Sequence, residues 1–395
     1  MTRLVIVYPA DPLGIIPGGV DTYIRGLIRW APEDIDISLV GITTDPSARP
    51  LGRWLSCNIG PKKFRFFAVL WEKHPGQRIG LPLSVRFVAG LLRYRPKFVS
   101  DVLEFHRIEP ALFYLRRRPI NLFVHQNMQI LEDPNSDILW RRWSAAYYAL
   151  ERYVMSRADS IITVREDAVD WYRGRMPELS GRFRFVPTWV DPTVFCVGSS
   201  KGRRVASQQL RKEFGFSEND QVIITVGRLD RQKDPLLLAS AFLTVCKSMP
   251  ELRLVYIGDG VLRTQLESLI TEHALGAQIK LAGLRSASQV ARYLQGADLF
   301  ALSSAYEGMP MCLLEALSSG LPAVSTRVGE VPRVMIQGEN GFMVDYGDAE
   351  ALASAMSKAL QRPWSPVDVA ATVSEYAAQQ VLSAVYGNYR RLAGA

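Results

Sequence analysis

The fold of this chain is decided by residues 303–320, SSAYEGMPMCLLEALSSG. A short apolar run at residues 298–302 comes directly before them and predicts a buried strand. An apolar helix is expected to start at Pro310, where a proline costs little, and to end at Gly320. The loop between this strand and this helix carries Glu307. A strand, a loop with a carboxylate and a helix are the parts from which an open α/β sheet builds a ligand site.

Two carboxylates lie on this stretch. Glu307 stands near the expected helix start and Glu315 stands two turns into the helix, with seven residues between them. The start of a helix presents unpaired N–H groups and a partial positive charge, which suits a phosphate group. Taken alone, the same stretch is equally well explained as a surface helix that carries two solvated carboxylates.

Length and composition indicate an ordinary globular protein. The 395 residues are enough for two or three domains, and 48% of them are hydrophobic. No apolar run approaches the roughly 18 residues of a membrane-spanning helix, and the run at residues 4–8 is too short for a signal peptide. We therefore expect a cytoplasmic protein. The cysteines lack metal-ligand spacing and are expected to be reduced core residues: Cys57, Cys196, Cys246 and Cys312.

The positive charge is unevenly distributed. Residues 1–195 carry +7 of the net charge of +8. Basic clusters at residues 62–65, 116–118 and 141–143 lie among aromatic residues, and anionic lipid headgroups attract such a surface. An anionic membrane surface is therefore one candidate partner, with peripheral attachment to the inner face of the plasma membrane, and a merely solvated basic face is the alternative. Nucleic acid is not expected, because no nucleic-acid-binding module is recognisable.

The first half of the chain alternates between predicted strands and helices, which indicates a doubly wound parallel sheet. Gly18 and Gly19 form the turn between a first strand and a helix, a corner where backbone N–H groups can approach a phosphate. His125 directly follows the strand predicted at residues 120–124, a position well suited to a binding site. An ordinary structural histidine explains His125 equally well.

The alternating pattern breaks and then restarts. After residues 187–192 the chain becomes polar and basic, and a new apolar strand follows at residues 222–226. We therefore predict four parts: a first domain at residues 1–195, a linker at 196–208, a second doubly wound domain at 209–373 and a terminal helix at 374–395.

Charged residues and glycines follow several predicted strands of the second domain. Arg228 and Lys233 follow one strand, and residues 258–260, 283–285 and 307–310 follow others. The carboxyl ends of parallel strands line one crevice. There an arginine and a lysine can hold a diphosphate, and carboxylates can accept hydrogen bonds from sugar hydroxyls. This combination favours a nucleotide-sugar site over a dinucleotide site.

These residues resemble a retaining glycosyltransferase of family 4, within the glycosyl transferases group 1. Glu307 and Glu315 are similar to the family's Glu-x7-Glu motif, and residues 227–229 with Lys233 resemble its diphosphate-binding loop. Residues 258–260 and 320–324 also fit. The resemblance implies a GT-B fold, in which two Rossmann-like doubly wound parallel-sheet domains face each other across a cleft. It also implies that the terminal helix crosses back onto the first domain.

The resemblance implies a role for each charged residue. Arg228 and Lys233 would hold the donor diphosphate and stabilise the leaving nucleoside diphosphate, in place of a divalent metal, so no metal cofactor is expected. Glu307 would bind the hydroxyls of the transferred sugar, and Glu315 would bind the ribose. His125 would contact the donor sugar near the reaction centre.

The resemblance also implies uncharged donor contacts. Gly18 and Gly19 would let the first domain approach the phosphates, and Leu284 would lie near the base. The remaining implied contacts lie in the glycine turn and at the helix start: Gly258, Gly308, Met309, Pro310 and Met311.

The expected reaction is transfer of a hexose, with retention and without a protein nucleophile, to a lipid-linked or polysaccharide-precursor acceptor. GDP-mannose is slightly preferred over a UDP-hexose as donor, on the frequency of donors in the family. The alternatives are a nucleotide-sugar 2-epimerase of similar fold and a nucleotide-sugar-binding protein without catalysis. The chain departs from the family pattern at Asp234, where glycine is frequent, and at residues 329–333, where Glu330 and Arg333 replace the commoner residues.

Overall fold

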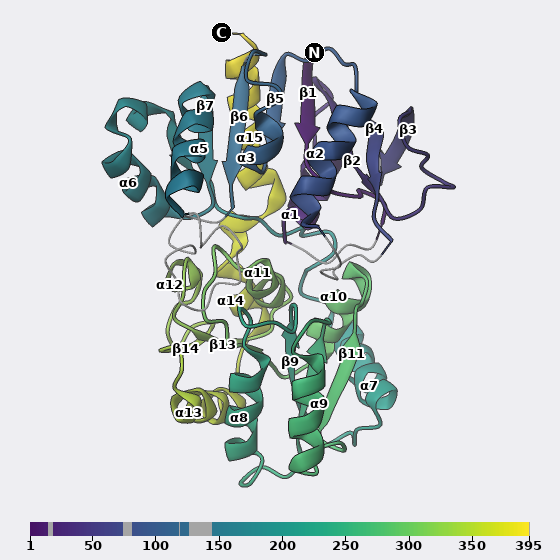
Figure 1. Ribbon diagram of the computed structural model, residues 1–395. Coiled ribbons are helices and arrows are strands. Elements are labelled where there is room, and N and C mark those ends of the chain that lie inside the picture. The colour runs from purple at the N-terminus through teal and green to yellow at the C-terminus, as the bar shows by residue number, and fades with distance from the viewer. Residues whose placement is uncertain (15–18, 74–80, 118, 126–143, 395) are drawn as a thin grey trace. The chain divides into compact units, whose positions relative to one another are not determined.

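The computed structural model describes residues 1–14, 19–73, 81–117, 119–125 and 144–394. It contains two compact units, drawn in Figure 1. Unit 1 comprises residues 1–188 and 378–395, and unit 2 comprises residues 189–377. The chain therefore passes from unit 1 to unit 2 after Thr188 and returns after Ala377.

Unit 1 is built on one sheet, in which the described strands have the order β3-β4-β2-β1-β5-β6-β7-β8. All neighbouring strands are parallel except β3, which pairs antiparallel with β4 at the edge of the sheet. The strands are β1 (Thr2–Val7), β2 (Ile35–Thr43), β3 (Trp54–Ile59), β4 (Lys62–Trp71), β5 (Val102–Phe105), β6 (Ile120–Val124), β7 (Ser160–Thr163) and β8 (Phe183–Phe185). The sequence analysis did not predict β3, because its residues do not alternate cleanly between apolar and polar.

Helices cover this sheet and close its core. They are α1 (Gly19–Arg29), α2 (Leu83–Tyr94), α3 (Ile108–Ala111), α5 (Ser144–Arg157), α6 (Glu166–Arg175), the 3₁₀ helix η2 (Pro177–Arg182) and α15 (Ala378–Ala393). Helix α5 is described from Ser144 onward, because residues 126–143 lie outside the described part of the chain.

The C-terminal helix α15 packs within unit 1 against β1 and β5. Its tyrosines are buried, and the hydroxyl of Tyr386 donates a hydrogen bond to the carbonyl of Leu27 on α1 (2.8 Å). Unit 1 is thus completed by residues from the far end of the chain, shown in yellow in Figure 1.

Unit 2 is built on a parallel sheet with the described strand order β11-β10-β9-β12-β13-β14. The strands are β9 (Gln221–Val226), β10 (Leu252–Ile257), β11 (Ile279–Gly283), β12 (Leu299–Leu302), β13 (Ala323–Thr326) and β14 (Gly341–Val344). Val222 and Ile224 pack into one apolar cluster and Ile223 into another, so β9 is buried on both faces. This explains why the strand reads as a continuous apolar run. The prediction of two doubly wound α/β domains is confirmed.

The helices of unit 2 lie on both faces of its sheet. They are α7 (Ser200–Phe214), α8 (Pro235–Val245), α9 (Arg263–Glu272), α10 (Ala287–Gly296), α11 (Met311–Ser318), α12 (Val331–Val334), α13 (Ala349–Gln361), α14 (Pro366–Ala371) and the 3₁₀ helix η3 (Ser374–Tyr376).

The segment predicted as a linker, residues 196–208, contains the beginning of α7 and lies within unit 2. Ser199 caps this helix by accepting a hydrogen bond from the N–H of Gly202 (3.1 Å). The polar composition was misleading because α7 buries only a narrow stripe, including Leu210, while the rest of its surface faces solvent.

The cysteine prediction was also wrong in part, since Cys196 is exposed and, of the four cysteines, only Cys312 is buried.

Candidate functional site

The loops that follow β9, β10, β11 and β12 meet at one edge of the sheet in unit 2, because these strands are neighbours. The N–H of Gly227 donates to the carbonyl of Ile257 (2.9 Å), which joins the loops after β9 and β10. The N–H of Gly258 donates to the carbonyl of Gly283 (2.9 Å), which joins the loops after β10 and β11. The residues predicted from separate stretches of unit 2 are therefore brought together.

Gly258 is the tightest point of this arrangement. Its φ of +135° is rarely adopted by other residues, and a Cβ atom there would lie 1.8 Å from the carbonyl oxygen of Gly227. Only glycine permits the two loops to approach so closely. The role of this predicted residue in the structure is therefore to hold the loop of Arg228 in place.

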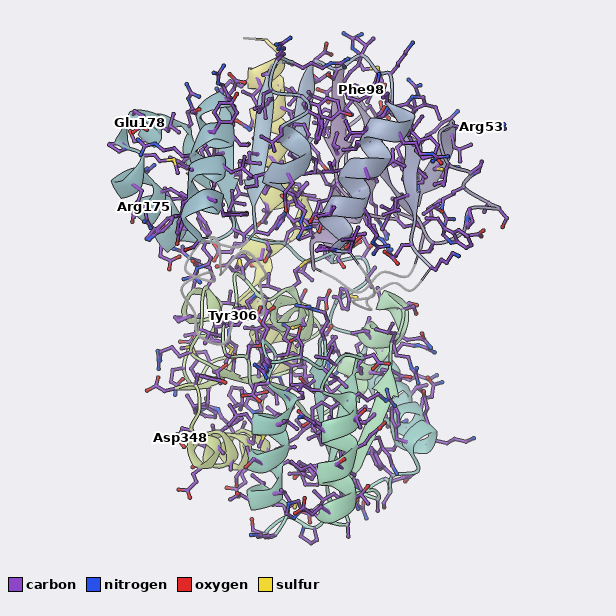
Figure 2. All side chains as sticks on the ribbon, in the orientation of Figure 1. Arg53, Phe98, Arg175, Glu178, Tyr306 and Asp348 are labelled. Atoms are coloured by element: carbon purple, nitrogen blue, oxygen red, sulfur yellow. The ribbon has the colours of Figure 1, made fainter. Side chains whose placement is uncertain are left out.

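A buried ion pair lies at the centre of the site. The ammonium of Lys233 is 2.6 Å from Oε1 of Glu307, and the hydroxyl of Ser304 donates to the same oxygen (2.6 Å). The side-chain amide of Gln232 approaches Oε2 of Glu307 at 3.4 Å. A carboxylate that is only 7% exposed needs such partners, because burying an unpaired charge is costly. Figure 2 shows Tyr306, next to Glu307, in the loop that leads to α11.

The surroundings keep Lys233 charged. Burial disfavours its ammonium form, but Cys312 when ionised and Glu307 raise the pKa of Lys233 above its usual value. Burial in turn raises the pKa of Cys312 to about 11, so that this thiol is protonated at neutral pH. The site therefore offers a fixed positive charge beside a carboxylate.

Arg228 belongs to the same network but remains closer to solvent. Its guanidinium lies 2.9 Å from the carboxylate of Asp230 and donates to Oε1 of Gln232 (2.9 Å). Gln232 thus connects Arg228 with Glu307. The Arg228 side chain is 45% exposed, which leaves it accessible to an anionic ligand.

The start of α11 faces the same loops. Pro310 is the N-cap of this helix rather than its first residue, and it provides no side-chain hydrogen bond. Met309 is buried, and the carbonyl of Gly308 accepts a hydrogen bond from the N–H of Glu330 (2.9 Å). Met311 is the first residue of α11. The loop at residues 329–333 therefore holds the segment that precedes the first turn of α11 in place through this hydrogen bond.

The loop at residues 329–333 carries the departures from the family pattern. Gly329 has a φ of +52°, and a Cβ atom there would lie 2.3 Å from the carbonyl oxygen of Glu307. The buried carboxylate of Glu330 accepts a hydrogen bond from Nε of Arg333 (3.0 Å). The additional carboxylate is thus paired with the additional arginine, so its charge is compensated within the loop.

Glu315 and Leu284 are the remaining predicted site residues of unit 2. Glu315 is half-buried on α11, and burial, only partly offset by Lys233, raises the pKa of its carboxyl to about 7. Leu284 follows β11 and is 42% exposed. A raised pKa at a half-buried carboxyl is typical of functional sites, although structural groups show it too.

Three of the predicted site residues belong to unit 1. Gly19 is the first residue of α1, and its neighbour Gly18 lies outside the described residues. His125 follows β6, and its Nε2 lies 2.6 Å from Nδ1 of His106. Burial and the neighbouring His106 lower the pKa of His125 well below its usual range, so its ring is neutral at physiological pH.

The sequence analysis missed several polar partners in the network, namely Ser304, Gln232 and Asp230. A signal was available for Ser304, since two serines directly follow a buried apolar strand that precedes a carboxylate. Gln232 and Asp230 stand between the two predicted basic residues, where a loop that folds back on itself brings them into contact.

The fold is shared with solved structures along nearly the whole chain. The structure is similar to sucrose-phosphate synthase from Thermosynechococcus elongatus, with a TM-score of 0.77 at 18% identity, covering 99% of both chains. It is also similar to HepE from Anabaena in complex with UDP-glucose, with a TM-score of 0.73 at 15% identity, covering 99% of this chain and 100% of that chain. These likenesses define the class of the fold as GT-B.

Sequence comparison points to the same class of protein. Residues 206–380 match the family described as glycosyl transferases group 1. The chain is 28% identical over 236 residues to D-inositol 3-phosphate glycosyltransferase from Corynebacterium urealyticum, covering 58% of this chain and 54% of that protein. It is 30% identical over 174 residues to UDP-Gal:alpha-D-GlcNAc-diphosphoundecaprenol alpha-1,3-galactosyltransferase from Escherichia coli, covering 43% of each. The chain thus spans about half the length of these relatives, and its resemblance to this family is confirmed.

Proposed function

We propose that this protein is a retaining glycosyltransferase that moves a hexose from a nucleoside-diphosphate sugar to a lipid-linked or polysaccharide-precursor acceptor. The observation that carries the proposal is the buried cluster of Lys233, Glu307 and Ser304 beside the start of α11. A cation, a carboxylate and a helix mouth within one cluster provide partners for both the diphosphate and the sugar.

In this proposal the basic residues act on the departing charge. Arg228 and Lys233 would bind the diphosphate, and their positive charges would stabilise the nucleoside diphosphate as the bond to the sugar breaks. The two cations would supply the stabilisation that a divalent metal supplies elsewhere, so we propose a metal-independent reaction.

The carboxylates act on the hydroxyl groups of the donor. Glu307, which is held by Lys233 and Ser304, would accept hydrogen bonds from hydroxyls of the transferred sugar. Glu315 would accept from the ribose, and Leu284 would lie near the base. His125 would contact the donor sugar with a neutral ring.

The donor is proposed by class. GDP-mannose was the first expectation, and UDP-hexoses now stand beside it because the name of the Escherichia coli relative includes UDP-Gal and HepE was solved with UDP-glucose. A panel of GDP- and UDP-sugars, measured by thermal shift, distinguishes them, because a specific ligand stabilises the folded state by mass action.

The proposal of a lipid-linked acceptor is supported by exposed basic and apolar residues of unit 1, which suit an anionic membrane surface. Lys63 and Arg65 are exposed on β4, beside the edge strand β3, and the guanidinium of Arg65 lies over the ring of Trp54 (4.7 Å). Val85 and Leu92, seven residues apart on α2, are exposed on one face of this helix. Exposed basic and apolar groups on the same unit suit an interface with anionic lipid.

Two predicted basic clusters contribute less to this argument. Arg118 and residues 141–143 lie outside the described residues. No helix within the described ranges is both long and apolar enough to cross a membrane. We propose peripheral attachment, which is tested by flotation with vesicles of anionic or neutral lipid. Equal binding to both vesicle types would contradict it.

The decisive experiment follows the fate of the sugar. The protein is incubated with a nucleotide sugar and a lipid-linked glycan, with and without EDTA, and the products are identified by mass spectrometry. We expect a glycosylated acceptor in both conditions. Loss of transfer on adding EDTA would contradict metal independence. An epimerised nucleotide sugar without acceptor would indicate the isomerase instead, and binding without turnover would indicate a non-catalytic protein.

A further inference from the structure

A buried polar chain within unit 1 leads from the C-terminal helix to His125. Oε1 of Glu104 lies 2.9 Å from Nε2 of His106, and Nδ1 of His106 lies 2.6 Å from Nε2 of His125. Glu104 is completely buried and His106 is 6% exposed. A charged group at such a position on β5 is costly unless it is fully hydrogen-bonded, so its partners carry information.

The second oxygen of Glu104 accepts two further hydrogen bonds. The side-chain amide of Asn121 donates to Oε2 (2.9 Å), and the hydroxyl of Tyr389 on α15 donates to the same oxygen. The amide of Asn388 in turn donates to Oδ1 of Asn121 (3.1 Å), which fixes the orientation of that amide. Both groups at Oε2 of Glu104 therefore act as donors, which suits a carboxylate oxygen.

The rings of the two histidines are held by aromatic neighbours. Phe123 stacks on both, with centroid distances of 5.2 Å to His106 and 5.6 Å to His125. Tyr23 meets the ring of His125 edge-on at 5.4 Å. Packing thus fixes the ring planes, and hydrogen bonds decide which nitrogen carries each proton.

We infer that Glu104 and His106 are positioning residues that fix the proton of His125 on Nε2 and leave its Nδ1 as a hydrogen-bond acceptor. In this assignment Nε2–H of His106 donates to the carboxylate of Glu104 and is the single proton of that ring, so Nδ1 of His106 carries none. This nitrogen can only accept, and Nε2 of His125 must therefore donate to it. His125 would then accept a hydrogen bond from a donor-sugar hydroxyl through Nδ1, a role that rests on the proposed function.

The variant Glu104→Gln tests the direction of this chain. Two donors converge on Oε2, so the amide oxygen of the glutamine takes that position and its NH₂ group faces His106. His106 must then accept at Nε2 and donate from Nδ1, and the proton of His125 moves from Nε2 to Nδ1. A nearly isosteric change is thus expected to reverse the tautomers of both histidines.

Nitrogen-15 NMR of the full chain labelled at histidine reads the tautomers directly. The chain has only four histidines, and a His125→Gln variant identifies the signal of His125. At pH 8 we expect the Nε2–H form of His125 in the wild type and the Nδ1–H form in Glu104→Gln. The wild-type spectrum is a test in itself, so the inference can be contradicted even if the variant does not fold.

The matched control is Tyr386→Phe. Tyr386 is buried on the same helix as Tyr389, but its hydroxyl donates to Leu27 and does not touch Glu104. The Tyr386→Phe variant should lose stability without any change in the tautomers of His106 and His125. A Nδ1–H form in the wild type, or an unchanged tautomer in a folded Glu104→Gln, would overturn the inference.

Activity provides the second measurement. Loss of a group that orients a ligand-contacting histidine is expected to lower the transfer rate of Glu104→Gln by about tenfold to hundredfold. If the wild type transfers no sugar, the proposed function fails. The tautomers still test the hydrogen-bonded chain from Glu104 through His106 to His125, because NMR needs no substrate. Reversed tautomers with an unchanged transfer rate would overturn the assigned role of His125 in sugar binding. The inferred direction of the hydrogen bonds from Glu104 to His125 would still hold.

Discussion

The ammonium group of Lys233 lies 2.6 Å from the carboxylate of Glu307, and both side chains are mostly hidden from solvent. The two residues predicted to bind different parts of the donor thus bind each other first. Each holds its partner in a defined position before any ligand arrives. A donor would therefore meet an organised pair of charges, and little of its binding free energy would be spent on ordering them.

The pair predicts non-additive stability. Lys233→Met leaves the buried carboxylate of Glu307 without its counter-charge and should lower the free energy of unfolding by about 3 kcal/mol. The double variant with Glu307→Gln should recover much of this loss, because no charge is then left unpaired. Urea denaturation measures both variants.

The control for this cycle is the exposed pair of Arg263 and Glu267 on α9, whose side chains are 35% and 49% exposed. Arg263→Met should change the free energy of unfolding by less than about 1 kcal/mol. Additive effects of the Lys233 and Glu307 changes would contradict the pairing.

From the raised pKa of Glu315 we predict that the difference in stability between Glu315→Gln and the wild type depends on pH. The pKa of its carboxyl is raised to about 7 in the folded protein, from an ordinary value of 4.5. The protonated form is thus favoured by folding, and its contribution is complete below pH 4.5 and is lost as the pH rises through 7. Glu315→Gln should match the wild type at pH 4.5 and melt a few degrees higher at pH 8. Equal melting temperatures at pH 8 would contradict the shift.

The same variant separates stability from binding. If Glu315 accepts hydrogen bonds from the ribose, Glu315→Gln should bind the nucleotide more weakly at pH 8 although it is the more stable protein. Isothermal titration with GDP and UDP measures this. A variant that is both more stable and equally good at binding would leave Glu315 without a ligand role.

Replacing Gly329 by alanine is expected to distort the site locally. A Cβ atom at this position would lie 2.3 Å from the carbonyl oxygen of Glu307, so Gly329→Ala must displace that loop. We expect at least about tenfold weaker nucleotide binding, since small displacements of binding groups are costly. Titration calorimetry measures the affinity.

Gly347 provides the matched substitution. It also has a positive φ, +89°, but a Cβ atom there would meet no neighbouring atom within 4 Å. Gly347→Ala should therefore show only the cost of backbone strain, about 1 to 2 kcal/mol, and bind nucleotide normally. Equal effects of the two alanines on binding would show that steric displacement of the Glu307 loop is unimportant.

The cysteines predict an order of chemical reactivity. Cys196 is exposed, whereas Cys312 is buried beside Lys233 with a pKa raised to about 11. Iodoacetamide at pH 8 should label Cys196 first and leave Cys312 unmodified in the folded protein, because the reactive species is the thiolate. Peptide mapping by mass spectrometry locates the label. Early modification of Cys312 would show that the Lys233 region opens to solvent.

Much of unit 2 could be predicted because its signals are local. The apolar runs of β9 and β12 and the glycines and charges that follow them lie close together in sequence. The polar surface of α7 concealed a helix, since its buried stripe is narrow. Ser304 and Gln232 were missed for a different reason. Their importance appears only when the loops after β9 and β12 are brought together.

The buried polar chain of Glu104, His106 and His125 in unit 1 could not be predicted from local patterns at all. Glu104 reads as one polar residue within an apolar strand, and its partner Tyr389 is 285 positions away. Neither residue gives a signal in its own stretch. Only the return of α15 to the sheet of unit 1 brings the hydroxyl to the carboxylate.

That return has a consequence for the biosynthesis of the protein. Unit 2 is one continuous segment, whereas unit 1 needs residues from both ends of the chain. A ribosome delivers the N-terminal part first, yet the sheet of unit 1 has no α15 to pack against until all of unit 2 has been translated. Unit 2 can therefore finish folding before unit 1, in the reverse of the usual order. Helix α15, which follows unit 2 in the sequence, also delivers Tyr389 to its partner Glu104.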